Sequence, residues 1–153
     1  MHSFSTNHRV GHSANDMFAL VADVERYPEF VPLCESIHMR GRDAQGDTEI
    51  VVVDMTVAYK LIRETFTSRA VFDRPNLKIV VDYLDGPFSS LENRWTFIER
   101  GADACDVNFH IAYEFRSRAL GLMMGAMFDR AFRKFSVAFE ERADRIYGRK
   151  ASV

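Results

Sequence analysis

Hydrophobic and polar residues alternate along the first two-thirds of the chain with the period of a β-strand. The first such segment covers residues 4–10, where Phe4 and Val10 share one face with Thr6 and His8. Six later segments repeat the pattern, over residues 35–43, 47–59, 61–73, 77–84, 89–100 and 104–116. Their connections are shorter than the dozen residues that a parallel crossover needs. The pattern therefore predicts a seven-stranded antiparallel sheet with one apolar face that needs a cover.

Two short helical segments are predicted between the first and second strands. Ser13 is followed three residues later by Asp16, which is typical of a capped helix start, and we expect a helix over residues 13–22. Residues 24–33 contain two prolines and cannot form one long helix. We interpret this stretch as a short helix followed by an apolar connecting loop.

The last segment, residues 119–147, has helical periodicity and is predicted to cover the sheet. After Phe128 it is amphipathic, but before Phe128 it is apolar on every side and contains two glycines. An end that is apolar all round must be covered by protein, ligand, partner or membrane. Two interpretations stay open. The helix start is wedged between the sheet and the loop of residues 27–33, or it is a soft mouth that opens to admit a lipid and touches a membrane while it does so.

Composition and size favour one α+β domain over residues 1–150. A chain of 153 residues can bury one sizeable core, and its apolar share of 47% is ordinary for a globular protein. Thirteen Phe and seven Met are less ordinary, because large or pliable side chains are used where an interior must fit an irregular surface. That excess hints at a ligand, although an aromatic core with nothing inside it has the same composition.

Charge and motifs argue against several classes of function. A net charge of −2 is not typical of a protein that binds DNA. Cys34 and Cys105 belong to no CxxC or His/Cys cluster, and the histidines show no metal-binding spacing, so we predict no metal and no disulfide. The longest apolar run, residues 119–128, is about half of a membrane span, and no secretory signal is evident. We expect a cytoplasmic protein with peripheral contact at the inner membrane.

Several short motifs are together similar to those of one known family. They are YPEFVPLC at residues 27–34, ETFTSR at 64–69, DGPF at 85–88, WTF at 95–97, FEERA at 139–143 and YG at 147–148. In this order they resemble the coenzyme Q-binding START-like family of the polyketide cyclase/dehydrase superfamily, which also includes ribosome-association toxins. The resemblance spans residues 3–148. It implies a helix-grip fold, a curved antiparallel sheet around a long C-terminal helix, with an apolar tunnel between them.

The resemblance also implies a ligand, ubiquinone or a related isoprenoid lipid, bound without a recognised catalytic step and with no separate cofactor. A quinone ring needs a flat apolar slot and one or two hydrogen-bond donors, and its tail needs soft walls. The aromatic residues that can make the slot are Phe66, Trp95, Phe97 and Tyr113. The other predicted apolar contacts are Tyr27, Phe30, Val31, Leu33, Met55, Val57, Met123, Met127, Phe128 and Phe132. At helical or strand spacing the same residues are also typical of a plain core.

Two polar residues fall on the predicted inner face of the sheet. Glu64 shares strand parity with Phe66, and Asn93 lies between Leu91 and Trp95 on one face. A carboxylate buried alone is unfavourable, so Glu64 is expected either to pair with an arginine or asparagine or to hydrogen-bond a ligand head group. We favour the structural pair for Glu64 and treat Asn93 as a second polar contact.

Three functions are compatible with these observations. The first is a non-catalytic carrier or chaperone of a quinone that supports respiration. The second is a ribosome-binding protein that interferes with subunit joining, with Arg130, Arg133 and Lys134 on the exposed helix face. The third is an enzyme of the cyclase or dehydratase kind, in which Glu64 or Tyr113 acts as acid or base. The apolar helix start, the excess of Phe and Met and the family resemblance together favour the first function, and no motif spacing requires the third.

Overall fold

A computed structural model describes residues 2–148, so the expected domain boundaries at residues 1 and 150 lie outside the described range. The strands are β1 (His2–Val10), β2 (Cys34–Gln45), β3 (Thr48–Tyr59), β4 (Ile62–Asp73), β5 (Lys78–Asp85), β6 (Phe88–Glu99) and β7 (Cys105–Phe115). The helices are α1 (Ala14–Ala22), the 3-10 helix η1 (Val24–Glu29) and α2 (Arg118–Tyr147). Each predicted element is present, with ends that differ from the prediction by at most two residues.

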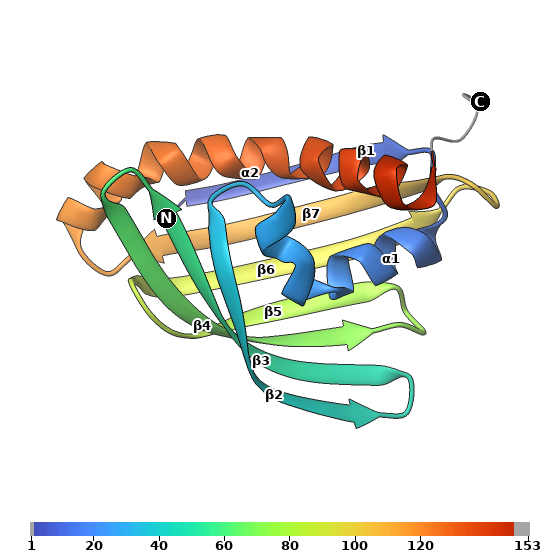
Figure 1. Cartoon of the computed structure of the whole chain (residues 1–153), viewed down its shortest axis with the longest axis horizontal. Coiled ribbons are helices and arrows are strands. Elements are labelled where there is room, and N and C mark those ends of the chain that lie inside the picture. Colours follow the sequence, from blue (N-terminus) through green and yellow to red (C-terminus); the bar gives the residue numbers. More distant parts are fainter. Residues whose placement is uncertain (1, 149–153) are drawn as a thin grey trace.

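The strands form one sheet in the order β1-β7-β6-β5-β4-β3-β2, and every neighbouring pair is antiparallel. The predicted helix-grip architecture is therefore confirmed: α2 lies along one face of a curved sheet, and α1 and η1 lie beside it (Figure 1). The sequence pattern did not indicate that β1 pairs with β7, the last strand of the chain.

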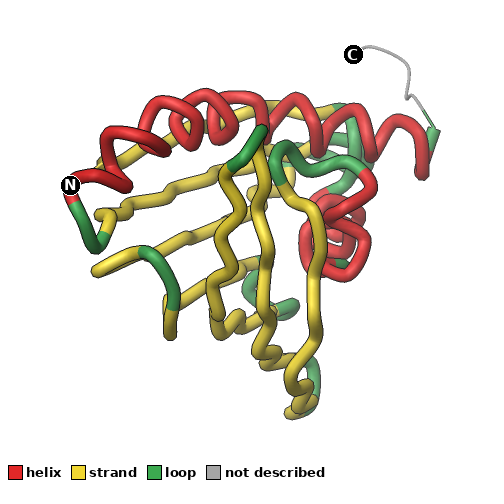
Figure 2. Tube along the Cα trace, turned by 60° about the vertical axis from the view of Figure 1, so that its left-hand side comes forward, coloured by secondary structure: helices red, strands yellow, loops and turns green. Residues whose placement is uncertain are grey.

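The sheet bends strongly, and its two halves run in different directions beneath α2 (Figure 2). Register shifts mark where the pairing is interrupted: two in the β2–β3 pair, one at Thr67/Ser68 in the β4–β5 pair and one at Phe88/Ser90 in the β6–β7 pair. A bulge bends its strand and increases the local twist. These bulges let the sheet curve around a space instead of packing flat against the helix.

Both α-helices, α1 and α2, begin at a serine N-cap. The Ser13 hydroxyl accepts a hydrogen bond from the Asp16 amide at 3.1 Å, as the sequence predicts, and the Ser117 hydroxyl accepts one from the Leu120 amide at 3.1 Å. The 3-10 helix η1 follows α1 and ends at Glu29, one residue after Pro28, which lies inside it. The chain then turns through a loop into β2.

The two halves of α2 differ in how they are covered. Phe128, Phe132 and Phe139 are buried against the sheet, whereas Leu122 is 82% exposed and Met123 is 60% exposed. The helix start is thus not wedged on all sides by protein, as one of our two interpretations required. Its outer side is an exposed apolar surface, and only its inner side, at Met124 and Gly125, is buried.

Candidate ligand cavity

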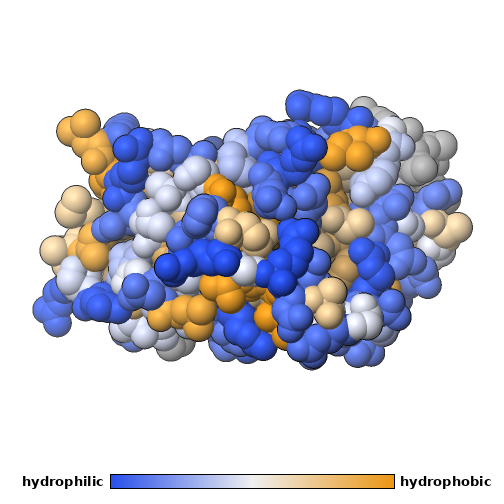
Figure 3. All heavy atoms as spheres, turned by 60° about the horizontal axis from the view of Figure 1, so that its bottom comes forward, coloured by the Kyte–Doolittle hydropathy of each residue, from blue (hydrophilic) through white to orange (hydrophobic). Residues whose placement is uncertain are grey.

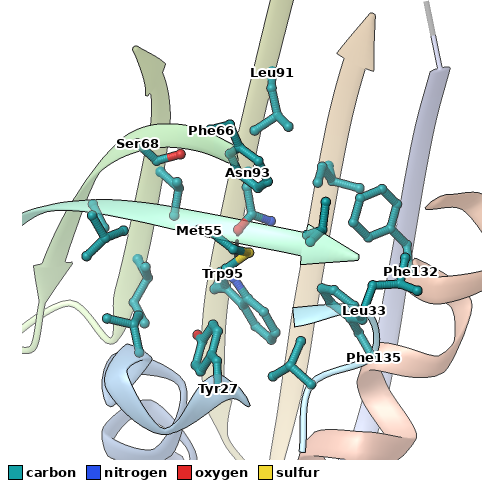
Figure 4. A pocket seen from close by; sticks show the side chains of 18 of the residues that line it. Tyr27, Leu33, Met55, Phe66, Ser68, Leu91, Asn93, Trp95, Phe132 and Phe135 are labelled. Atoms are coloured by element: carbon teal, nitrogen blue, oxygen red, sulfur yellow. Dashed lines mark hydrogen bonds between the residues drawn. The ribbon is translucent and has the colours of Figure 1, made fainter. Parts of the chain in front are cut away.

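A cavity of about 110 Å³ lies between the curved sheet, the loop after η1 and the middle of α2 (Figure 4). Its walls come from η1 and its loop (Val24, Tyr27, Val31, Pro32, Leu33), β3 and β4 (Val53, Met55, Val57, Phe66, Ser68, Ala70, Phe72), β5 to β7 (Ile79, Val81, Phe88, Leu91, Asn93, Trp95, Ile111) and α2 (Phe128, Phe132, Phe135, Phe139). Among these lining residues there is no charged side chain.

Trp95 forms the floor of the cavity on β6. Its ring lies 4.7 Å from Phe109 and 5.2 Å from Phe139, centroid to centroid, so the sheet and α2 hold it from two sides. Its indole Nε1 donates a 2.9 Å hydrogen bond to Asn93 Oδ1, and Asn93 Nδ2 donates to the His110 carbonyl at 2.9 Å. The predicted inward position of Asn93 is confirmed, and these two bonds fix the orientation of its amide (Figure 4).

The helix η1 and the loop after it close one side of the cavity. Tyr27 donates its hydroxyl proton to the Val21 carbonyl, and burial raises the pKa of this phenol above its usual value. Leu33 has a left-handed backbone with φ 69°, and its carbonyl accepts a 3.0 Å bond from the Ala58 amide of β3. The left-handed region is uncommon for a residue other than glycine. The loop therefore turns sharply and is attached to the sheet at Leu33.

The turn between β5 and β6 supports the opposite wall. A Cβ atom added to Gly86, which has φ 142°, would stand 2.6 Å from Phe66 Cβ and 2.9 Å from its Cα. Only glycine permits this approach and this backbone conformation. The DGPF segment thus sets the position of Phe66, one of the aromatic walls.

Ser68 is the polar residue of the cavity that has no partner. Its side chain is 4% exposed, and its hydroxyl makes no hydrogen bond with any residue of the described chain. It lies on β4 between Phe66 and Ala70, which face the same cavity. In Figure 4 its oxygen is directed inward, toward the side on which Phe66 and Asn93 lie.

Comparison with known proteins identifies the family. Residues 10–140 match the family model described as polyketide cyclase / dehydrase and lipid transport. The chain belongs to this family. It is 34% identical to the ribosome association toxin RatA of Vibrio cholerae over 97% of this chain and 99% of that protein. It is 28% identical to the coenzyme Q-binding protein COQ10 homolog B of Xenopus laevis, over 96% of this chain and 60% of that protein.

A solved structure shows the same fold at low identity. The Zhui aromatase/cyclase from Streptomyces has a TM-score of 0.79 and 17% identity, and the match covers 97% of this chain and 99% of that one. At this identity the likeness concerns the fold alone. The same fold therefore occurs in proteins with different names, so the cavity of this chain must be interpreted from its own residues.

Ten of the sixteen predicted contact residues line the cavity of this family member. They are Tyr27, Val31, Leu33, Met55, Val57, Phe66, Asn93, Trp95, Phe128 and Phe132. They come from η1 and its loop, three strands and α2, and only the curvature of the sheet brings them together. Whether they contact a ligand stays a prediction.

Three predicted aromatic residues do not reach the cavity, because neighbouring side chains pack over them. Phe97 lies beside α1, 5.8 Å from Phe18, and Phe30 packs outside the cavity, 5.1 Å from Phe139. Tyr113 is enclosed by a group of phenylalanines under α2, and burial raises the pKa of its hydroxyl to about 12. The sequence correctly predicted that these side chains face the interior. Other side chains of the protein, and not the cavity, lie against each of them.

Three further predicted contacts, two on α2 and one on β4, do not line the cavity either. Met123 is 60% exposed on the outer side of α2, and Met127 is partly buried against the core without lining the cavity. Glu64 is partly exposed near the start of β4 and makes no ion pair or hydrogen bond with residues 2–148. The favoured structural pair for Glu64 is therefore wrong. Partial exposure lets water solvate this carboxylate, so no partner is required.

The prediction missed other lining residues, above all Ser68. The missed residues are Val24, Pro32, Val53, Ser68, Ala70, Phe72, Ile79, Val81, Phe88, Leu91, Ile111, Phe135 and Phe139. Ser68 could have been found, because it shares strand parity with Phe66 and Ala70 and is a polar residue among inward apolar ones. The others have no such signal, since a lining residue and a core residue look alike in sequence.

Proposed function

We propose that this chain binds one apolar molecule, an isoprenoid quinone or a related lipid, between its sheet and α2, and acts as a carrier or chaperone that supports respiratory electron transport. The observation that carries the proposal is the cavity, which is almost entirely apolar and has few polar groups, as small-molecule sites usually are. The similarity to a coenzyme Q-binding protein over 96% of the chain supports the choice of a quinone. The quinone is proposed as cargo, not as a resident cofactor.

The size of the cavity sets a condition on this proposal. Its volume of about 110 Å³ is somewhat smaller than the ~150 Å³ apolar cavity that is known to hold benzene in another protein. A substituted ring with a tail therefore needs the walls to move apart. The loop of residues 30–33 and the first turns of α2, which contain Gly121 and Gly125, are the segments we expect to move.

The test is direct, because Trp95 is the single tryptophan of the sequence and lines the cavity. Quinones quench indole fluorescence on contact, so decylubiquinone should quench Trp95 saturably at one molecule per chain. In parallel, mass spectrometry of an organic extract from natively purified protein should detect an isoprenoid lipid. A protein that carries no lipid and shows no saturable quenching would contradict the proposal.

A membrane contact is part of the same proposal. None of the described helices is long and apolar enough to cross a bilayer. Leu122 and Met123 nevertheless project from the start of α2, and apolar atoms stand out at that end of the molecule, on the left of Figure 3. Leu61, in the β3–β4 turn at the same end, is also fully exposed (Figure 1). We propose that this end touches the bilayer from which the ligand is taken.

Ribosome binding is the second candidate, favoured by the 34% identity to RatA over nearly its whole length. The cationic side chains proposed for it, Arg130, Arg133 and Lys134, are exposed on α2. Arg133 is partly engaged, since it bonds Asp129 at 3.0 Å and lies 5.1 Å from the Phe4 ring. Co-sedimentation with ribosomal subunits at moderate salt tests this function, and failure to co-migrate would exclude it.

The enzymatic alternative loses its two proposed groups. Glu64 and Tyr113 both lie outside the cavity, so neither is placed to act as acid or base on a molecule bound there. The described lining offers only the hydroxyls of Tyr27 and Ser68 and the amide of Asn93 as polar side chains, apart from the indole N–H of Trp95. Tyr27 already donates to a backbone carbonyl. We therefore do not propose a reaction.

A further inference from the structure

We infer that Ser68 is the polar anchor of the cavity and that the cavity selects a neutral, oxygen-bearing lipid over one with an ionised head group. This inference rests on the proposed function and specifies the chemistry of the ligand. Three features of the site carry it: an unpartnered hydroxyl, a strand alternation that points this hydroxyl inward, and a lining without charge.

The first feature is the state of the Ser68 hydroxyl. The side chain is 4% exposed and its oxygen has no hydrogen-bond partner among residues 2–148. A buried hydroxyl without a partner is unfavourable, and most buried polar groups in folded proteins are paired. Its neighbours on the inner face of β4 are Phe66 and Ala70, neither of which offers a side-chain partner. The free hydroxyl is therefore available to a molecule in the cavity.

The second feature is the backbone at Ser68. The pairing of β4 with β5 shifts between Thr67, which faces Asp85, and Ser68, which faces Tyr83. The skipped residue is Leu84, so the bulge lies in β5 and not in β4. β4 keeps its alternation, and Phe66, Ser68, Ala70 and Phe72 all line the cavity. The hydroxyl of Tyr83 accepts a 3.1 Å hydrogen bond from the amide of Phe88, behind the lining, and Tyr83 itself does not line the cavity. The alternation of β4 thus points Ser68 into the cavity, where it is the polar side chain of this strand.

The third feature is charge. The lining contains no Lys, Arg or His, so a carboxylate or phosphate drawn fully inside would be buried without a counter-charge. Such burial is strongly unfavourable. A ring carbonyl, ether or hydroxyl needs only one hydrogen bond, which Ser68 can donate or accept. Asn93 keeps one N–H and one acceptor lone pair beyond its bonds to His110 and Trp95, so it can support a second oxygen.

The experiment compares three ligands with three proteins. The ligands are decylubiquinone, decylbenzene, which has a ring and the same tail but no oxygen, and palmitate, which carries a carboxylate. The proteins are the natural sequence, Ser68→Ala, and the control Ser36→Ala on the exposed side of β2. Quenching of Trp95 fluorescence measures the binding of decylubiquinone. The binding of decylbenzene and of palmitate is measured by how well each displaces decylubiquinone.

We expect Ser68→Ala to weaken decylubiquinone binding about 3- to 10-fold, the range for one hydrogen bond, and to leave decylbenzene unchanged. Ser36→Ala should change neither, and palmitate should displace decylubiquinone weakly from all three proteins. If Ser68→Ala binds decylubiquinone as the natural protein does, or if palmitate competes equally well, the inference is overturned while the proposed function stands. If the natural protein binds neither decylubiquinone nor decylbenzene, the proposed function fails and the inference fails with it.

Discussion

Arg142 of α2 donates a 2.6 Å hydrogen bond to Glu29 of η1, across a separation of 113 residues. The Arg142 side chain is 11% exposed, and its guanidinium lies 4.9 Å from the centroid of the Phe30 ring. Phe139, one turn earlier on α2, contacts both Tyr27 and Phe30. The two motifs at residues 27–34 and 139–143 are thus one structural unit, which joins the cavity loop to the covering helix.

Replacing Glu29 should loosen this unit. Glu29→Gln leaves the largely buried Arg142 without a carboxylate, so we expect a clear fall in the urea concentration at the midpoint of unfolding. The matched control is Glu25→Gln, also in η1, whose partner Arg42 lies 3.1 Å away in an exposed pair. That change should have little effect, because exposed ion pairs contribute little. Equal effects of the two changes would contradict the role of the Glu29–Arg142 bond.

Acid should weaken the contact that Asp106 of β7 makes with two arginines. Hydrogen bonds from Arg9 and from Arg100, the latter at 2.8 Å, lower the pKa of Asp106 from 3.8 to about 2. A lowered pKa in the folded state stabilises the fold above the ordinary pKa, and this stabilisation is lost as pH falls through the folded value. Urea unfolding should thus show Asp106→Asn to be less stable than the natural protein above pH 3.8, with the difference shrinking toward pH 2.

Asp47→Asn, in the exposed turn between β2 and β3, is the control for Asp106. It should not change the pH dependence of unfolding over this range. A difference for Asp106→Asn that stays constant from neutral pH to pH 2 would show that the ionised carboxylate is not what the two arginines stabilise.

Removing the Ser68 hydroxyl should stabilise the ligand-free protein. An unpaired buried hydroxyl is unfavourable, so Ser68→Ala is expected to raise the free energy of unfolding by about 1 kcal/mol. With decylubiquinone added, the natural protein should become the more stable of the two, because it binds the ligand more tightly and is stabilised more by it. Chemical denaturation with and without decylubiquinone measures both. A ligand-free Ser68→Ala protein that is less stable would show that the hydroxyl has a structural role.

Filling the cavity should prevent binding without unfolding the protein. Ala70 is 3% exposed and lines the cavity, so Ala70→Leu places extra methyl groups in a space of about 110 Å³. We expect decylubiquinone affinity to fall at least tenfold, while the free energy of unfolding falls by no more than the ~1–3 kcal/mol that added methylenes cost in a core without a cavity. Val71→Leu, the next residue on the other face of β4, is the control and should bind normally. Trp95 quenching and urea unfolding measure the two quantities.

The exposed apolar start of α2 should determine membrane contact. The double change Leu122→Ser and Met123→Ser removes two side chains that are 82% and 60% exposed. Because inserting one such side chain contributes about 1.5–3 kcal/mol, binding to phosphatidylcholine vesicles should fall at least tenfold. Val137→Ser changes another exposed apolar residue of α2 and should leave vesicle co-sedimentation unchanged. A natural protein that does not bind vesicles would contradict the proposed contact.

Strand parity predicted much of the sheet correctly, because side chains alternate between faces wherever the backbone is extended. Trp95, Phe97 and Asn93 of β6 were all expected on the inner face. Parity does not say what lies above each position, however. Asn93 and Trp95 face the cavity, whereas Phe97, two residues further along, is covered by Phe18 of α1. The distinction depends on helix placement, which one strand cannot encode.

By itself the sequence determined the elements, their antiparallel pairing and the apolar face that α2 covers. These features follow from local periodicity, turn residues and caps such as Ser13, each of which acts over a few residues. Tertiary structure alone decided the pairing of β1 with β7, the bond between Glu29 and Arg142, and the cavity beside Ser68. The physical reason is that a cavity is a volume left between elements, and its size depends on bulges and helix positions that no local pattern specifies.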